Sequence, residues 1–479
     1  MGRARFRQLF GIDVRTLALL RISLASLVLL DLCLRARDLS AHYTDGGVLP
    51  RDILIEEFLT RWQWSFHLFN GTSQFQALLF AMAGVVALAM LVGFRTRVTT
   101  VLTWVLLCSV QTRNPAIGPA VDDALRLFVF WSMFLPLGAV WSVDAMRSPR
   151  GLDNPVVSVA SVGIMVQVAL IYVVTVVLKS DPAWRSDFTA IYYALSLDEM
   201  ATSIGLAVRN YPALMKVLTF VTFALEIIAP VAVFVPVMTA KVRMVAIAAM
   251  MLLHLGMGLC LTIGMFPYVM WVGWWAFLPG EFWDRLGLQT GLIADAQPAR
   301  LTRSQQLRHW GPQLLAAIAL VYVLAYSGRV VDRQRYWFVV SPSMNAFGSA
   351  LKLKQNWGVF APRPHSGDGW YVMPAMRRDG VEIDLFRGGG PVSYDKPARI
   401  TDDYANDRWR KYLLHLRSGE SKRHAPLYLD YLCRDWNGVH LGTNQMVSSV
   451  RLYFMEEYTL PDGQVRPIER KLLLEHPCP

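Results

Sequence analysis

The sequence has few cysteines and lacks the motifs of common metal and nucleotide sites. Its 479 residues include 5 cysteines, which are too few for a disulfide framework. No Cys-x-x-Cys pair, His-Glu-x-x-His helix or glycine-rich phosphate loop occurs along the chain. We therefore expect neither a metal centre nor a nucleotide site.

Charged residues are also scarce. They make up 17% of the chain against 54% hydrophobic residues, a balance too apolar for a soluble protein of this length. The net charge of +11 comes from short arginine clusters between apolar runs, where basic residues mark cytoplasmic loops rather than a nucleic-acid surface. The composition predicts a polytopic membrane protein whose main partner is the lipid bilayer. The start of the chain lacks a cleavable signal pattern, so the first apolar run should remain as a helix.

Apolar runs that could cross a bilayer fill most of the first part of the chain. A span needs about 20 apolar residues, and somewhat fewer when it is tightly packed. The candidates are residues 16–34, 75–94, 99–110, 125–141, 156–178, 214–238, 242–263, 266–278 and 312–326. Two of these runs are short, so we expect a membrane α-helical bundle of about 8–9 transmembrane helices.

Loop charges orient these helices. Basic residues occur before the first run and after every second run that follows: Arg3, Arg5, Arg7, Arg15, Arg95, Arg97, Arg147, Arg150, Lys241, Arg243, Arg285, Arg300, Arg303 and Arg308. The intervening loops are mixed or acidic, as at Asp181 and Glu199. The positive-inside rule then places the N-terminus in the cytoplasm, and nine spans place the C-terminal part outside. Lys179 lies on the outer side in this arrangement.

The last part of the chain predicts a separate α+β domain. We expect a transmembrane domain over residues 1–330 and an extracytoplasmic domain over residues 331–479. Runs at 370–376 and 381–386 flank Asp379-Gly380, and runs at 447–458 and 465–474 flank Asp462-Gly463, which are hairpin patterns. Residues 404–416 and 427–436 have helical spacing. Cys433 and Cys478 could form a disulfide if this domain is exported.

Three ionisable residues in or beside the spans need an explanation. Lys179 closes the apolar run 156–178, where it is either an anchor that reaches the headgroups or a base held in a dry pocket. Glu226 is a lone carboxylate inside a span, either a buried structural acid or a catalytic partner of Lys179. His254 in the next span is either a packed, hydrogen-bonded histidine or a site residue.

A second polar group is centred on Asp122 and Asp123. These carboxylates either cap a helix N-terminus or form a polar wall of a site at the outer membrane boundary. Arg21 and Asp31 lie ten residues apart in the first span, which is about 15 Å along a helix and too far for a direct ion pair. Each should contact another helix, although Asp31 could instead face a cavity shared with Lys179.

The stretch from Ile263 to Trp271 contains Gly264 and Pro267 within a continuous apolar run. Such a break is tolerated at membrane depth where it lines a cavity, which makes Phe266, Pro267 and Tyr268 candidate walls for a flat apolar ligand. The alternative is a simple hairpin between two spans.

Several of these segments resemble the vitamin K-dependent γ-carboxylase family and the bacterial horizontally transferred transmembrane domain (HTTM) proteins that share its core. The segments that carry the resemblance are residues 20–32, 43–50, 93–97, 113–115, Lys179 with Trp184, 263–270, Trp357, 379–380, 408–409 and 428–436. Of these segments, 263–270 is the most literal match to the animal carboxylase. Where the animal enzyme has an Asn-His pair in the loop before the fourth span, this chain has Asn114-Pro115 and then Asp122-Asp123.

The resemblance implies a fold, a reaction and a location. In the animal enzyme, the lysine that matches Lys179 deprotonates vitamin K hydroquinone. Oxygenation of the hydroquinone then drives removal of a γ-proton from a substrate glutamate, to which carbon dioxide adds. Reduced vitamin K or menaquinol would then be the cofactor, with oxygen and carbon dioxide as co-substrates and an exported protein or peptide as substrate. The relatives that share the core imply a bacterial inner membrane.

The resemblance also implies roles for individual residues. We assign Asp122, Asp123 and Glu226 as polar catalytic partners of Lys179. Phe266, Pro267, Tyr268, His254 and Trp184 are assigned to the quinone pocket.

Two other classes of function remain open. A non-enzymatic membrane protein could use its exported domain to bind a partner or help it mature, with Lys179 as an anchor. A transporter is less favoured because the spans do not form two halves with matching interruptions.

Overall fold

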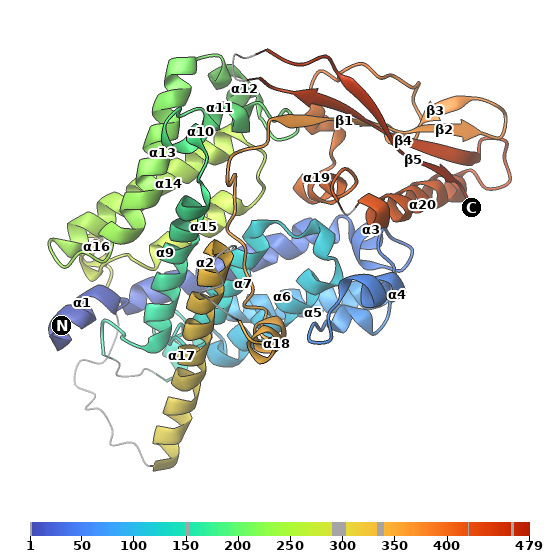
Figure 1. The fold of residues 1–479 in the computed structure, drawn as a ribbon. Coiled ribbons are helices and arrows are strands. Elements are labelled where there is room, and N and C mark those ends of the chain that lie inside the picture. Colours follow the sequence, from blue (N-terminus) through green and yellow to red (C-terminus); the bar gives the residue numbers. More distant parts are fainter. Residues whose placement is uncertain (1, 149–152, 290–302, 333–339, 420, 461–463) are drawn as a thin grey trace.

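The computed structural model describes residues 2–148, 153–289, 303–332, 340–419, 421–460 and 464–479 (Figure 1). Within these ranges, 6 helices are long and apolar enough to cross a membrane. They are α2 (Val14–Ala36), α5 (Ser73–Val92), α9 (Val159–Leu178), α13 (Pro212–Ala232), α14 (Thr239–Cys260) and α17 (Arg303–Val331), the last with its apolar part over Trp310–Val331. The chain is therefore an integral membrane protein built around an apolar helix bundle.

Three further helices coincide with the remaining expected spans but do not meet the same criteria of length and apolar character. They are α6 (Thr96–Arg113), α7 (Ala120–Ser132) and α15 (Phe266–Trp275). At 13 residues, α7 is only about 20 Å long, and it is buried on nearly all sides. Its apolar side chains, including the fully buried Trp131, contact other helices rather than lipid.

Short helices connect these elements. They are α1 (Arg3–Phe10), α3 (Leu39–Tyr43), α4 (Arg51–Ile53), η1 (Leu54–Phe58), η2 (Phe66–Leu68), η3 (Pro115–Ile117), α8 (Val143–Arg147), α10 (Pro182–Arg185), α11 (Ala190–Leu195), α12 (Ser203–Arg209), α16 (Gly280–Arg285) and α18 (Pro342–Ala350). The N-terminus and α16 lie at one end of the bundle, and the C-terminal sheet lies at the other (Figure 1).

Within its described residues, the C-terminal part is a five-stranded antiparallel sheet accompanied by helices. The strands are β1 (Gly367–Val372), β2 (Pro374–Arg377), β3 (Glu382–Asp384), β4 (Val447–Tyr458) and β5 (Glu469–Pro477). The long strand β4 pairs with β1, β2 and β5, and β3 pairs with β2. A short helix, η4 (Ile400–Asp403), precedes α19 (Asp407–Leu414) and α20 (Ser421–Val439). The two longer helices lie between the sheet and the bundle (Figure 1).

The Asp379-Gly380 hairpin is confirmed, since Ala375 of β2 pairs with Ile383 of β3. Residues 370–376 are not the single strand that we expected. The chain breaks at Met373, whose N–H is bonded to the Asp384 carboxylate at 3.2 Å and whose carbonyl accepts from Leu385. The turn at Asp462-Gly463 lies outside the described residues, although β4 and β5 on either side of it do pair.

The sheet domain is held to the bundle by ion pairs with the loop that follows α11. Arg417 contacts Glu199 at 2.8 Å, and Lys396 contacts Asp198 at 2.7 Å. On the bundle side, Trp64 donates its indole N–H to the Ala350 carbonyl at 2.9 Å. These contacts fix the C-terminal domain against the bundle end that carries Lys179.

Cys433 of α20 and Cys478 after β5 form a disulfide across a sequence separation of 45. A double Cys433→Ala/Cys478→Ala variant should lose about 2–4 kcal/mol of unfolding free energy, because the bond restricts the unfolded chain. Thermal unfolding with and without reductant measures this. Cys33→Ala, which removes a free exposed thiol, is the control. A reductant-insensitive wild type would contradict the prediction.

Candidate functional site

Lys179 is placed by the end of α9. The helix begins at a capping box of Ser158 and Ser161, and Lys179 is the residue at its C-terminal cap. Its backbone N–H still donates to the Thr175 carbonyl at 3.0 Å. The side chain points into the protein, as its exposed fraction of only 2% shows. An anchoring lysine would extend to the headgroup region, whereas this ammonium group lies inside the protein.

The partner of Lys179 is Glu226 of α13. Lys179 Nζ lies 2.6 Å from Glu226 Oε2, and Glu226 is 7% exposed. The same Nζ is 3.7 Å from the centroid of the Trp184 ring, a cation–π distance. Trp184 is itself fixed by donating its indole N–H to the Phe360 carbonyl at 3.0 Å. A carboxylate and an aromatic face therefore hold the amine in one position.

This pair faces a cavity of about 450 Å³ between α9, α13 and α14. Most of its wall is aliphatic or aromatic, and Phe360 belongs to the segment 352–360, which we call the strap. Thr175 also lines the cavity and donates its hydroxyl to the strap carbonyl of Trp357 at 2.8 Å. An apolar cavity of this size with a few convergent polar groups is typical of a small-molecule site.

His254 lies on the same cavity, at the end of a hydrogen-bond chain. Trp274 donates its indole N–H to the Tyr172 hydroxyl at 2.8 Å, and that hydroxyl is 3.2 Å from His254 Nε2. His254 Nδ1 is 2.7 Å from the Met250 carbonyl. Because a carbonyl only accepts, Nδ1 carries a proton, and in the neutral ring Nε2 accepts from the Tyr172 hydroxyl.

The three residues of the expected break do not share one position. α14 ends at Cys260 and α15 begins at Phe266, with Gly264 between them at a φ of +58°. Phe266 lines the cavity, and its ring centroid is 5.9 Å from that of His254. Pro267 packs beside Gly258 instead. Tyr268 is 52% exposed, and its ring contacts that of Trp271. Neither contributes to the cavity wall among the described residues.

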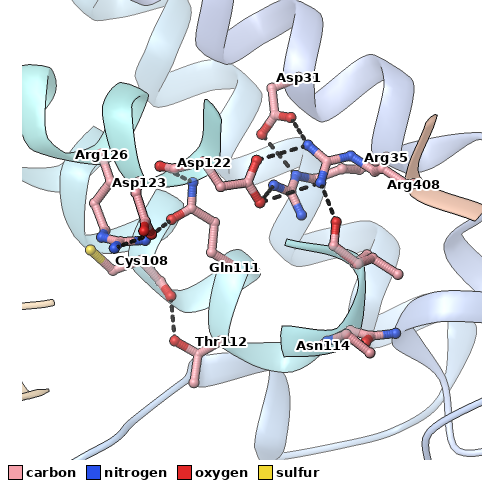
Figure 2. Close-up of polar contacts among 12 residues, drawn as sticks. Asp31, Arg35, Cys108, Gln111, Thr112, Asn114, Asp122, Asp123, Arg126 and Arg408 are labelled. Carbon is pink, nitrogen blue, oxygen red and sulfur yellow. Dashed lines mark hydrogen bonds and ion pairs between the residues drawn. The ribbon is translucent and has the colours of Figure 1, made fainter. Parts of the chain in front are cut away.

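Asp122 lies away from Lys179, in a buried charge network with Asp31, Arg35 and Arg408 (Figure 2). Arg35 contacts Asp31 at 2.8 Å and Asp122 at 2.6 Å. Arg408 of α19 contacts the same two carboxylates at 2.5 and 3.1 Å. Two carboxylates and two guanidinium groups thus neutralise one another where the C-terminal domain meets the bundle. Asp31 faces this network and not the Lys179 cavity.

Asp123 points to the other side of α7. It contacts Arg126 at 2.7 Å, and Arg126 also donates to Gln111 (Figure 2). Asp122 and Asp123 both line a second, polar cavity of about 400 Å³. Arg21 donates from its two terminal nitrogens to backbone carbonyls, including that of Leu137 at 3.0 Å. The structure therefore brings Lys179, Glu226, Trp184, His254 and Phe266 together and leaves the two aspartates apart.

Sequence reasoning missed Tyr172 and the strap. Tyr172 precedes Lys179 by seven residues, about two helical turns, so both side chains lie on one face of α9. That spacing within an apolar run could have identified it. The strap carries no such pattern, because its place on the cavity depends on contacts with helices far away in sequence.

A model for the HTTM domain matches residues 11–282, which is more than half of the chain. Comparison with curated proteins and with solved structures gives no match. The matched residues include Lys179, Glu226, Trp184, His254 and Phe266.

Proposed function

This chain belongs to the HTTM domain family, and from that premise we propose a quinol-coupled membrane enzyme of the carboxylase type. Its cofactor would be a reduced prenylated naphthoquinone such as menaquinol. The observation that carries this proposal is the Lys179–Glu226 pair, buried at 2.6 Å against an apolar cavity. A cation that only anchors a helix does not need a cavity.

The cavity suits a flat ring with a prenyl tail. Phe266 and Trp184 offer aromatic faces, and the remaining wall is largely aliphatic. Val221 of α13 and Leu252 of α14 line the cavity and are 43% and 67% exposed on the outer surface of the bundle. The cavity thus extends to the lipid-facing surface between these helices, which supports entry of a lipid-soluble ligand from the bilayer.

When bound, a reduced quinone supplies a hydroquinone whose reaction with oxygen drives removal of a γ-proton from a glutamate side chain, to which carbon dioxide adds. Lys179 can accept a proton only as a neutral amine. Glu226 Oε2, at 2.6 Å, can take the ammonium proton and leave that amine. Trp184 covers one side of Nζ and helps to exclude water. His254 uses both ring nitrogens for Met250 and Tyr172, so its role would be to hold the cavity wall in place rather than to move a proton.

We also propose the orientation that a secreted substrate requires. The basic loops support a cytoplasmic N-terminus under the positive-inside rule. The Cys433–Cys478 disulfide supports an oxidising compartment for the C-terminal domain. With α6, α7 and α15 counted as short spans, nine crossings put Lys179 and this domain on the outer side of a bacterial inner membrane. An exported protein or peptide could reach the site there.

The test of this proposal is the ligand itself. Mild-detergent purification followed by lipid extraction and mass spectrometry should detect a naphthoquinone, and the protein should convert its reduced form to an epoxide only with oxygen present. Ala249→Phe places a ring in the cavity and should lower the bound quinone. The matched control is Ala248→Phe, at an exposed position on the same helix. Absence of quinone and of epoxide would overturn the proposal.

A further inference from the structure

The second cavity, of about 400 Å³, is separate from the Lys179 cavity and has a different character. It lies between the end of α6, the start of α7, the end of α18, the strap and α19. Lysine and arginine side chains contribute to its wall: Arg126, Lys352, Lys354 and Lys411. The proposed quinone chemistry makes no use of them.

The strap places two of these lysines on one side. Lys352, Lys354 and Asn356 line the cavity, while the residues between them point the other way. Leu353 and Gln355 are 0% and 3% exposed within the bundle. Lys352 ends the turn after α18 at a φ of +51°, and the alternation continues from there along the strap. The position is locked, because Arg126 donates to the carbonyl of Lys352 at 2.8 Å.

The charges of the wall do not cancel. Asp122 is neutralised by Arg35 and Arg408, and Asp123 is paired with Arg126. In the part of the chain that the structure describes, no carboxylate forms an ion pair with the remaining three cations: Lys352, Lys354 and Lys411. Half-buried ammonium groups without a counter-charge are unfavourable.

Two further features favour an anion. Burial, together with the neighbouring Arg126 and Lys354, lowers the pKa of the Lys352 ammonium to about 8. The cavity wall also includes Pro119 and Ala120 at the start of the 13-residue helix α7, whose cap provides no side-chain acceptor. The two carboxylates in its first turn, Asp122 and Asp123, are already paired with arginines. Lysines serve as point charges for phosphate, and a helix N-terminus supports the same ligand.

We propose that this cavity binds a phosphate group, carried either by an anionic phospholipid or by a free phosphate. An apolar groove of about 450 Å³ between α17 and α18 adjoins it, since Phe347 lines the groove and Gly348 lines the cavity. A lipid acyl chain could lie in that groove. The proposal is independent of the quinone chemistry, because the two cavities share no lining residue.

Native mass spectrometry of the full chain from neutral-lipid nanodiscs tests this proposal. If the ligand is a lipid, added phosphatidylglycerol should be retained in preference to phosphatidylcholine. If it is free phosphate, inorganic phosphate should be retained in preference to chloride. Lys352→Gln/Lys354→Gln should weaken retention of the effective ligand about 10- to 30-fold.

The control with the same loss of charge is Lys216→Gln/Lys241→Gln, at two exposed positions on α13 and α14, which should change retention less than about twofold. Without ligand, the Lys352/Lys354 variant should melt no lower than wild type, because it removes two mutually repelling charges. Equal retention by both variants, or no retention of either probe by wild type, would overturn the phosphate site.

Discussion

Lys179→Ala should lower oxygen-dependent epoxidation of a reduced naphthoquinone by about 10²- to 10⁴-fold, the contribution typical of a positioned acid–base group. Nζ is the amine of the cavity pair, held by Glu226 at 2.6 Å and by the Trp184 ring. Lys179→Arg should be nearly as damaging, because a guanidinium keeps the ion pair but does not give up its proton. Turnover of the reduced quinone to epoxide is the measurement.

The alanine variant leaves Glu226 buried without a partner, so structural damage must be separated from loss of a base. Lys179→Ala/Glu226→Ala removes both charges and should restore folding but not epoxidation. Lys216→Ala, at an exposed lysine of α13, should behave as wild type. Activity recovered in the double variant would contradict the role of Lys179 as a base. A silent Lys179→Arg change would favour the non-enzymatic alternative.

Arg408→Met should cost about 3–5 kcal/mol of unfolding free energy, the range for breaking a buried ion pair. Arg408 contacts Asp31 and Asp122, whose side chains are 2% and 7% exposed. Its loss leaves two buried carboxylates with only Arg35 to neutralise them. Unfolding of the purified protein in detergent, followed by tryptophan fluorescence, measures the change.

Arg399→Met provides the matched control, because Arg399 is 46% exposed and lies 3.7 Å from Asp402, which is 65% exposed. That change should cost under about 1 kcal/mol. Adding Asp31→Asn to Arg408→Met restores neutrality around Arg35 and Asp122, and should recover a large part of the loss. If Arg408→Met were as mild as Arg399→Met, the network would not be a stabilising contact.

Most of the long helices could be predicted because their apolar runs are continuous. The run 16–34 became α2 at Val14–Ala36, a difference of two residues at each end. The run 125–141 was predicted less accurately, since α7 covers Ala120–Ser132 and lies inside the bundle. Apolar composition does not distinguish a side chain facing lipid from one facing protein. The break at Met373 was hidden for a related reason, as it depends on a bond to Asp384.

The candidate site was partly predictable. A lysine at a span end and a lone carboxylate in another span indicated a pair, and the expected contact of Lys179 with Glu226 is present. The catalytic roles of both stay predictions. Asp122 and Asp123 were grouped with Lys179 because all three were assigned to the outer boundary. Sequence gives the depth of a residue in the bundle but not which neighbour it meets. Asp122 pairs with arginines of α2 and α19, and Asp123 pairs with Arg126 of its own helix.

The Arg408 network also bears on how the protein is made. Asp31 and Arg408 are 377 residues apart in sequence. During synthesis, the first span therefore enters the membrane long before the residue that completes its charge balance has been translated. Until α19 emerges, Asp31, Arg35 and Asp122 carry one uncompensated negative charge, so the bundle reaches its final electrostatic state only when the last quarter of the polypeptide arrives. A truncated chain that ends before Arg408 should be a substrate for membrane proteolysis rather than a stable bundle.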